Sequence, residues 1–296
     1  MTSIPGGLHG AYTYQQARAA LGDYGLRSAV DRGRLVGFGR GVLLAEGRQH
    51  DVRTRAAAAT LLAGPDSVLV HSTAAVLHGY TAISGYTVHI RVPYRRRVRS
   101  RAGMIVHQGP IDESEIVYRD GLRVLRLAPL LAELLRAASR RGGLACADQI
   151  LRRFPEPARA EFREEVAQLL AASPNQRGTR QAAELLGLAT GLPESPGQSA
   201  ALLTMVEAGL PRPRCQHPVY DGAGQLLHRL DFAWPEERIA LEYDGDEGRA
   251  DNDLIRDADL RRRGWLVFRA QADDLHDPTA LSIRLREVFA DRQLAA

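Results

Sequence analysis

Lysine is absent from this chain of 296 residues, and all 39 of its basic residues are arginines. High-GC codon usage is the simplest cause, because alanine, glycine and proline are also frequent. The chemical consequence does not depend on the cause. A chain without lysine has no P-loop lysine, no Schiff-base lysine and no lysine for a nuclease motif. Walker-type ATPases, aldolases and pyridoxal-phosphate enzymes are therefore disfavoured.

Cysteines and long apolar runs are also scarce. Cys146 and Cys215 lie far apart in unrelated contexts, so they predict neither a disulfide framework nor a zinc cluster. No run approaches the roughly 18 apolar residues of a membrane-spanning helix, and the first residues lack the pattern of a secretory signal. We therefore expect a cytoplasmic protein without a membrane partner. Its length suits two or three domains.

Charge is spread unevenly along the chain. Residues 1–110 carry 14 arginines and five acids, a net charge of +9, whereas the remainder has a net charge of −5. A basic segment joined to an acidic one indicates contact with nucleic acid at the basic end. Residues 242–259 hold eight acids and two arginines. Such a cluster is either a solvated surface or a cation site.

The first 50 residues predict a winged helix-turn-helix. Thr13 can cap a helix over 14–21, and a second helix over 26–32 ends at Gly33. Two short strands, 35–38 and 41–44, then form a hairpin. Such a domain binds DNA through its second helix and its wing, so the expected DNA-binding residues are Arg27, Ser28, Arg32, Arg34 and Arg40. The alternative is a small helical domain with a solvated arginine face.

Residues 51–172 predict a middle domain with an arginine-rich loop. A helix, a strand at 67–70, a helix over 71–78 and a strand at 88–92 lead into this loop, which contains Arg95, Arg96, Arg97, Arg99 and Arg101. The loop either contacts phosphates or is simply solvated. His71, His78 and His89 lack an accompanying acid or cysteine, so structural or surface roles are favoured over metal binding. Residues 124–171 are helical by period, and a boundary is expected near 172–178.

Three segments carry a resemblance to a known family: residues 12–44, including GRLVGFGRGVLL, residues 67–80, SVLVHSTAAVLHGY, and residues 86–106, YTVHIRVPYRRRVRSRAGMIV. Together they resemble the N-terminal region of AbiEi-type antitoxins of type IV toxin–antitoxin systems. The resemblance covers roughly half of the chain. It implies a DNA-binding autoregulator, with DNA and a toxin protein as partners.

The C-terminal part predicts a hairpin that brings carboxylates together. Strands at 230–234 and 239–244 are joined by a four-residue loop, and pairing of 234 with 239 places Asp231 opposite Glu242. Asp244 follows on the same face of its strand. Three converging carboxylates can hold Mg²⁺, with Mn²⁺ as a substitute, and the cation can activate water against a phosphodiester. The alternative is a half-buried hairpin whose polar face meets solvent.

Residues 230–268 carry a second resemblance, through Asp231, Trp234-Pro235, Glu242-Tyr243-Asp244-Gly245, Arg256-Asp257 and Gly264-Trp265. They resemble the very-short-patch-repair-like branch of the PD-(D/E)XK nuclease superfamily, and the match extends from about residue 178 to the C-terminus. This implies metal-dependent cleavage of DNA, with Asp231 and Glu242 as metal ligands and Asp244 as a further acidic residue of the catalytic and metal site.

The chain departs from that family at three points. Gln198 stands where the helix opening at Ser195-Pro196 usually carries a glutamate. Asp246-Glu247-Gly248 stands where a histidine commonly follows the Asp-Gly pair, and the motif lysine is missing. His228 is the nearest candidate base, but the simple alternation of strand residues puts it on the apolar side. The domain is thus either an active endonuclease or a degenerate one kept for binding.

Together these expectations describe an α/β (α+β) chain with three parts. Residues 1–50 form the winged helix-turn-helix, and residues 51–172 form the helical and β-stranded middle domain. Residues 178–296 form a restriction-endonuclease-like mixed sheet flanked by helices.

Overall fold

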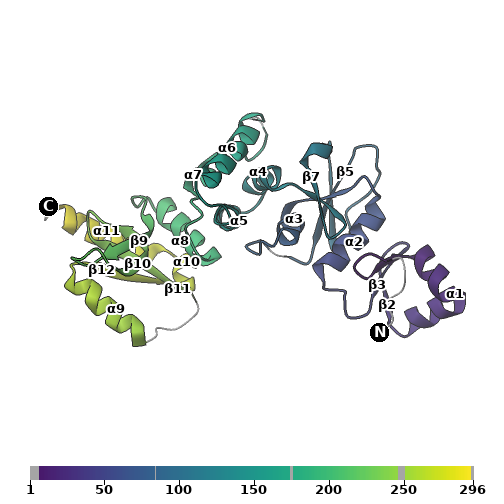
Figure 1. Cartoon of the computed structure of the whole chain (residues 1–296), viewed down its shortest axis with the longest axis horizontal. Helices are drawn as coiled ribbons and strands as arrows, with labels where there is room; N and C mark the ends of the chain where they lie inside the picture. Colours follow the sequence, from purple (N-terminus) through teal and green to yellow (C-terminus); the bar gives the residue numbers. More distant parts are fainter. Residues whose placement is uncertain (1–6, 84, 174–175, 246–250, 295–296) are drawn as a thin grey trace. The chain divides into compact units, whose positions relative to one another are not determined.

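The computed structural model describes residues 7–83, 85–173, 176–245 and 251–294. This described part is a mixed α/β structure with eleven α-helices and three β-sheets. The chain divides into two compact units, Met1–Arg136 with Glu165–Asn175 and Ala137–Glu164 with Gln176–Ala296 (Figure 1). No helix among the described residues is both long enough and apolar enough to cross a membrane.

Unit 1 begins with a broken helix and a small antiparallel sheet. Its elements are β1 (Ala11–Thr13), α1 (Tyr14–Asp31), β2 (Leu35–Gly39) and β3 (Val42–Ala45), and the strand order is β1-β3-β2. The two predicted helices appear within α1 as segments separated at Gly22, whose φ of 68° and ψ of 172° interrupt the helix. Thr13 caps α1 as predicted, and Gln16 completes a capping box. Strand β1 was not predicted from the sequence.

The second segment of α1 is held by a small apolar core. Leu26 and Ala29 pack with Leu35 of β2 and Leu43 of β3. A helix that buries these two positions presents the intervening ones to solvent. Gly33 follows the C-cap with a φ of 71°, which confirms its predicted place after the helix.

A second, five-stranded sheet forms the rest of unit 1. Its strands run in the order β6-β5-β4-β8-β7: β4 (Val68–Leu69), β5 (Val88–Val92), β6 (Met104–Gln108), β7 (Ile116–Arg119) and β8 (Leu122–Leu125). The helices are α2 (Val52–Ala63), α3 (His71–Leu77) and α4 (Leu127–Ala137), with a short 3₁₀ turn at Glu113–Glu115. Leucines of α4 at positions 130, 131, 134 and 135 are fully buried, as the predicted apolar stripe requires.

Four helices open unit 2: α5 (Arg140–Leu151), α6 (Ala158–Ala171), which continues into unit 1, α7 (Thr179–Leu188) and α8 (Pro196–Glu207). Buried Asp148 of α5 joins these helices, because its carboxylate accepts the N–H groups of Thr190 and Gly191 at 2.9 and 2.8 Å and the hydroxyl of Ser199 at 2.7 Å. The predicted middle domain ran to residue 172. These bonds instead place α5 with the C-terminal part of the chain.

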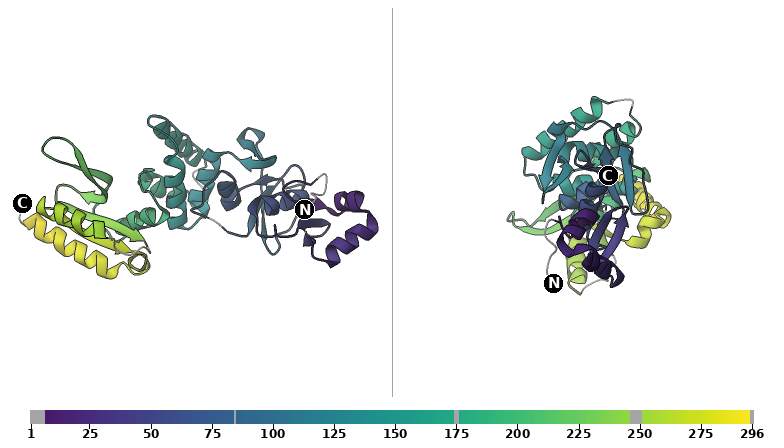
Figure 2. Two further views of the ribbon diagram at one scale, coloured as in Figure 1. Left: turned by 60° about the horizontal axis from the view of Figure 1, so that its bottom comes forward. Right: turned by 90° about the vertical axis from the view of Figure 1, so that its right-hand side faces the viewer.

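A four-stranded sheet follows, in the order β12-β11-β10-β9. Its elements are β9 (Arg214–Tyr220), β10 (Leu226–Trp234), β11 (Ile239–Gly245), α9 (Asp251–Arg262), β12 (Leu266–Gln271), α10 (Ala272–His276) and α11 (Thr279–Leu294). The first three strands are antiparallel, and β12 joins β11 in parallel after α9. One face packs on α8, α10 and α11, and the other on α9 (Figures 1 and 2).

Candidate active site

The β10–β11 hairpin brings Asp231 and Glu242 together. Trp234 pairs with Ile239 as predicted, and the ladder continues through Ala233–Ala240 and Phe232–Leu241. Its continuation places Asp231 beside Glu242 on the face that α9 covers. Asp231 Oδ2 also accepts the N–H of Tyr243 at 3.0 Å. The predicted pairing of the two strands is therefore confirmed.

Both carboxyl groups are shielded from water. Glu242 is only 5% exposed, and burial together with the negative charge of Asp231 raises its pKa to about 7, against the opposing effect of Arg256. Burial also raises the pKa of Asp231, although the N–H of Tyr243 and the amide of Gln216 favour its charged form. A buried and a half-buried carboxyl group at opposed strand positions repel each other unless a proton or a cation lies near them.

Arginines from neighbouring elements hold the acidic side chains. Arg256 of α9 donates two hydrogen bonds to Glu242, at 2.9 and 3.1 Å. Arg269 of β12 lies 2.6 Å from Asp244 and 2.9 Å from buried Asp257. The acidic run 242–259 is therefore largely ion-paired where its side chains are described. Arg256 and Asp257, which are among the residues that carry the nuclease resemblance, connect α9 to the sheet by bonding Glu242 and Arg269.

The predicted triad is only partly assembled. Asp231 and Glu242 face each other, whereas Asp244 is engaged with Arg269. Within the described residues, no three His, Cys, Asp or Glu side chains are grouped to hold a metal ion. Mg²⁺, however, is commonly held by one or two carboxylates, with water and substrate phosphate completing its shell. The Asp231–Glu242 pair fits that requirement, and its repulsion is what a cation would relieve.

An open cleft of about 350 Å³ lies over the carboxylate pair. Glu194, Gln216 and His228 line it together with Asp231, Glu242 and two arginines, Arg229 and Arg256. Gln216 Nε2 donates to Asp231 Oδ1 at 3.3 Å, and the charge of Glu194 acts to raise the pKa of Asp231. Glu194 thus supplies a third acid to this cleft from the segment just before α8.

His228 belongs to this cleft, contrary to its predicted position on the apolar side. Its Nε2 lies 2.9 Å from Oδ2 of Asp259 on α9. Simple alternation fails because β10 and β9 are irregular here: pairing shifts between Leu226 and His228, and Gln216 has a φ of 53°. Leu230 accordingly packs with the α9 cluster, whereas Phe232 packs with the opposite one.

The start of α8 shows what Gln198 does. Ser195 Oγ accepts the N–H of Gln198 at 3.1 Å, so Ser195 is the N-cap of α8. Buried Gln198 in turn accepts the N–H of Glu194 at 2.5 Å, whereas in a capping box it would accept the N–H of Ser195. Gln198 therefore fixes the backbone that carries Glu194.

The predicted DNA-binding residues of the first 50 all reach the surface. Arg27 on the second segment of α1 and Arg32 at its C-cap are exposed, and Ser28 between them is half-buried. Arg34, just before β2, and Arg40, between β2 and β3, are exposed as well. The helix and the hairpin therefore both offer unburied guanidinium groups.

The arginine-rich loop is partly engaged within unit 1. Arg95 lies 2.7 Å from Asp66 and Arg96 lies 3.4 Å from it, while the guanidinium of Arg101 lies against Gly39 of β2. Two further arginines of the loop, Arg97 and Arg99, are exposed.

His71 and His89 belong to one stacked cluster of histidines, and His78 lies elsewhere. His71 stacks on His89 at 4.6 Å between ring centroids, and His89 Nδ1 lies 3.0 Å from Nε2 of His107, a residue outside the predicted set. His78 instead bonds the carbonyl of Leu125. Burial lowers the pKa of His89 to about 4, so this cluster is neutral at physiological pH.

Some sequence expectations lie outside the described residues. Asp246 and Glu247, which follow Asp244-Gly245 in place of the family's histidine, are among them. Four further residues of the cleft or its border were not predicted from the sequence, namely Glu194, Gln216, Arg229 and Asp259.

No protein-family model matches the chain. Two uncharacterized proteins of Mycobacterium tuberculosis do: MT2308 of strain CDC 1551 / Oshkosh and Rv2248 of strain ATCC 25618 / H37Rv. Each is 33% identical over 270 residues, an alignment that covers 86% of this chain and 93% of the relative. This coverage extends over most of both proteins. The chain therefore belongs to the same family as these two mycobacterial proteins.

Proposed function

We propose that unit 2 is a metal-dependent endodeoxyribonuclease domain whose centre is the Asp231–Glu242 pair. The observation that carries this proposal is the close approach of two shielded carboxyl groups in an open cleft, with the pKa of Glu242 raised to about 7. Closely spaced carboxyl groups with a raised pKa are typical of functional sites, where charge is concentrated for a ligand. Arginines around the cleft suit a polyanionic substrate.

The order of elements in unit 2 supports a restriction-endonuclease-like domain. A helix, three antiparallel strands, a crossover helix and a parallel strand follow one another as α8, β9, β10, β11, α9 and β12. Asp231 lies on the second strand and Glu242 on the third of a sheet flanked by helices, and such a flanked sheet is what the resemblance to the very-short-patch-repair-like branch implies. Gln198 on α8 departs from that pattern, and nearby Glu194 offers an acid in its place.

Asp231 and Glu242 would hold Mg²⁺, or Mn²⁺ in its place, and Asp244 would join them if Arg269 released it. When bound, the cation would polarise the phosphodiester and activate a water molecule. Arg256, whose guanidinium lies at the edge of the same cleft beside Glu242, would contact the substrate phosphate. His228 would accept a proton from the water as the water oxygen bonds to phosphorus. The bond from phosphorus to the sugar oxygen breaks, and the sugar oxygen leaves with a proton taken from solvent. Asp259 acts as a positioning residue that orients the imidazole.

The proposal is tested by incubating the full chain with labelled single- and double-stranded DNA. We expect cleavage with Mg²⁺ or Mn²⁺ and none with EDTA. Persistence of cleavage in excess EDTA would show a contaminating or metal-independent activity.

Replacement of His228 by alanine should slow cleavage about 10²- to 10⁴-fold, the usual contribution of a positioned base. DNA binding should stay within about twofold of wild type, because the imidazole acts on water rather than on the strand. Asp259→Asn should lower the rate less, and added imidazole should partly rescue His228→Ala. The matched control is His276→Ala, which removes an exposed histidine of α10. A purely structural role is indicated if imidazole rescues nothing and the variant unfolds more easily.

We further propose that the N-terminal part of unit 1 is a winged helix-turn-helix that binds DNA. Its exposed Arg27 and Arg32 on one helix segment and Arg40 on the hairpin support this, together with the +9 charge of residues 1–110. Each guanidinium that neutralises a phosphate adds about 0.9 to the slope of log K against log salt concentration for duplex DNA. The double variant Arg27→Ala/Arg32→Ala should weaken duplex binding and lower that slope by one to two. Arg119→Ala, an exposed arginine of β7, is the control; equal effects of the two would refute the helix model.

A second candidate is a non-catalytic DNA-binding antitoxin or autoregulator with a degenerate nuclease domain. The observation that favours it is the pairing of Glu242 with Arg256 and of Asp244 with Arg269, which gives both acids a cationic partner without a metal. Gln198 in place of an acid points the same way. This candidate predicts DNA binding without cleavage, and co-purification with a toxin protein.

A further inference from the structure

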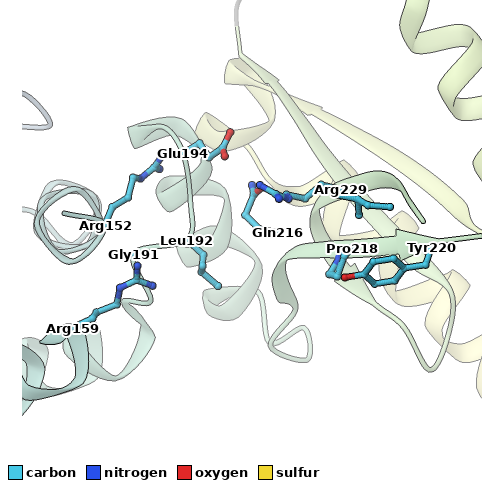
Figure 3. A pocket seen from close by; sticks show the side chains of 10 residues that line it. Arg152, Arg159, Gly191, Leu192, Glu194, Gln216, Pro218, Tyr220 and Arg229 are labelled. Atoms are coloured by element: carbon cyan, nitrogen blue, oxygen red, sulfur yellow. The ribbon is translucent and has the colours of Figure 1, made fainter. Parts of the chain in front are cut away.

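A second groove borders the carboxylate cleft within unit 2. It measures about 440 Å³ and shares Glu194, Gln216, Leu226 and Arg229 with the cleft, so the two hollows are continuous. Figure 3 shows its walls: helix-borne Arg152 and Arg159 face β9 and β10, which contribute Tyr220 and Arg229. We call this hollow the strand groove.

Three arginines give the strand groove a positive charge. Arg152 is held by the carbonyl of Pro193, and Arg159 by the carbonyls of Leu151, Phe154 and Thr190. These partners are neutral, so they orient the guanidinium groups without cancelling their charge. Glu156 lies 3.7 Å from Arg159 and is largely exposed, which makes it a weak partner.

Arg229 is the third of these arginines and the one nearest the carboxylates. It is exposed, and within the described residues no carboxylate pairs with its guanidinium. Glu194 is the single acid that lines the groove. The hollow thus carries a surplus of positive charge directly beside the site at which a phosphodiester is proposed to be cut.

Exposed apolar side chains alternate with these charges. Leu192 is 39% exposed, Leu226 46% and Tyr220 54%, and all three line the strand groove. Duplex DNA offers phosphates to such a surface but keeps its bases stacked inside. A single strand offers phosphates to the arginines and base faces to an aromatic ring, which is the usual basis of sequence-independent binding.

We infer that the strand groove binds a single polynucleotide strand and leads it to the carboxylate pair, with Tyr220 as a stacking platform and Arg229 as a phosphate contact. This inference rests on the proposed function in naming its substrate class. It adds that unit 2 acts on a strand that is already unpaired, such as a flap, an end or an opened segment.

The test measures binding in EDTA, where no cleavage interferes. Fluorescence anisotropy of the full chain uses a 15-nucleotide thymidine oligomer, its uridine RNA counterpart and a hairpin duplex. Stacking on an aromatic ring contributes roughly 1–3 kcal/mol per base, so Tyr220→Ala should weaken single-strand binding about 5- to 100-fold, and Tyr220→Phe should restore it. Arg229→Ala should lower the single-strand salt slope by about 0.7. Arg261→Ala on α9 is the charge-matched control.

Duplex binding should stay unchanged in Tyr220→Ala. Weakening of either the DNA or the RNA strand by this variant supports the inference and shows which polynucleotide the groove prefers. Unchanged single-strand binding in both Tyr220→Ala and Arg229→Ala, or an equal loss for the duplex, would overturn it. If the variants behave as expected but the wild-type chain cuts nothing, the nuclease proposal fails while the groove stands.

Discussion

Glu242→Gln is expected to abolish DNA cleavage, with a fall in single-turnover rate of at least about 10³-fold, or roughly 4 kcal/mol of transition-state stabilisation. Glutamine keeps the size of the side chain, but its amide can accept only one of the two hydrogen bonds from Arg256 and cannot supply the negative charge that a divalent cation needs. Asp231→Asn should have a similar effect. The rates are measured at pH 8 with saturating Mg²⁺, where Glu242 of the wild type is ionised.

The matched control is Glu236→Gln, which removes an exposed acid from the β10–β11 loop. It breaks only a surface ion pair with Arg214, so the rate should stay within about twofold. Glu242→Gln cutting within threefold of wild type would contradict the proposed centre. If no form of the protein cuts any DNA, the non-catalytic reading gains the support.

The same substitution should also change how stability depends on pH. The pKa of Glu242 is about 7 in the folded protein and ordinarily about 4.5. Between these values the folded state binds more protons than the unfolded one, so the free energy of unfolding falls as pH rises from 4.5 to 7. A pKa difference of about 2.5 corresponds to a fall of about 3 kcal/mol in the free energy of unfolding, and this lower stability persists above pH 7. Glu242→Gln should remove this decline.

Tryptophan fluorescence during urea unfolding measures this effect cleanly, since both tryptophans of the chain, Trp234 and Trp265, lie in unit 2. The informative quantity is wild type minus Glu242→Gln, because other groups of the unit, such as His217, titrate in both forms. Added Mg²⁺ should restore stability at pH 8 in the wild type alone. A pH profile of stability identical in the two proteins would show that ionisation of Glu242 does not cause the decline.

Local patterns predicted much of the fold. The cap at Thr13, the glycine at 33 and the alternation of 230–234 with 239–244 each rest on short-range rules, and the structure bears all three out. The pairing of Asp231 with Glu242 follows from that alternation alone. Of the three predicted carboxylates, only Asp244 does not join the pair, because it forms an ion pair with Arg269, 25 residues further along the chain.

Other features depend on contacts that no local pattern contains. His228 was assigned to the wrong face because regular alternation was assumed through Gln216, whose φ of 53° is a tertiary feature of the paired strands. Asp259 and Glu194 enter the cleft from α9 and from before α8. Gln216 alone has a local signal, since Asp221-Gly222-Ala223-Gly224 is typical of a turn, and a hairpin through it places Gln216 nearly opposite Asp231.

Direct titration of Mn²⁺ tests the central claim, that Asp231 and Glu242 form a divalent-cation site, without requiring the right DNA substrate. Calorimetry or Mn²⁺ paramagnetic resonance at pH 8 should detect one site per wild-type chain. That site should be lost in Asp231→Asn and in Glu242→Gln but kept in Glu236→Gln. Absence of binding in the wild type, or binding that survives in both carboxylate variants, would contradict the account.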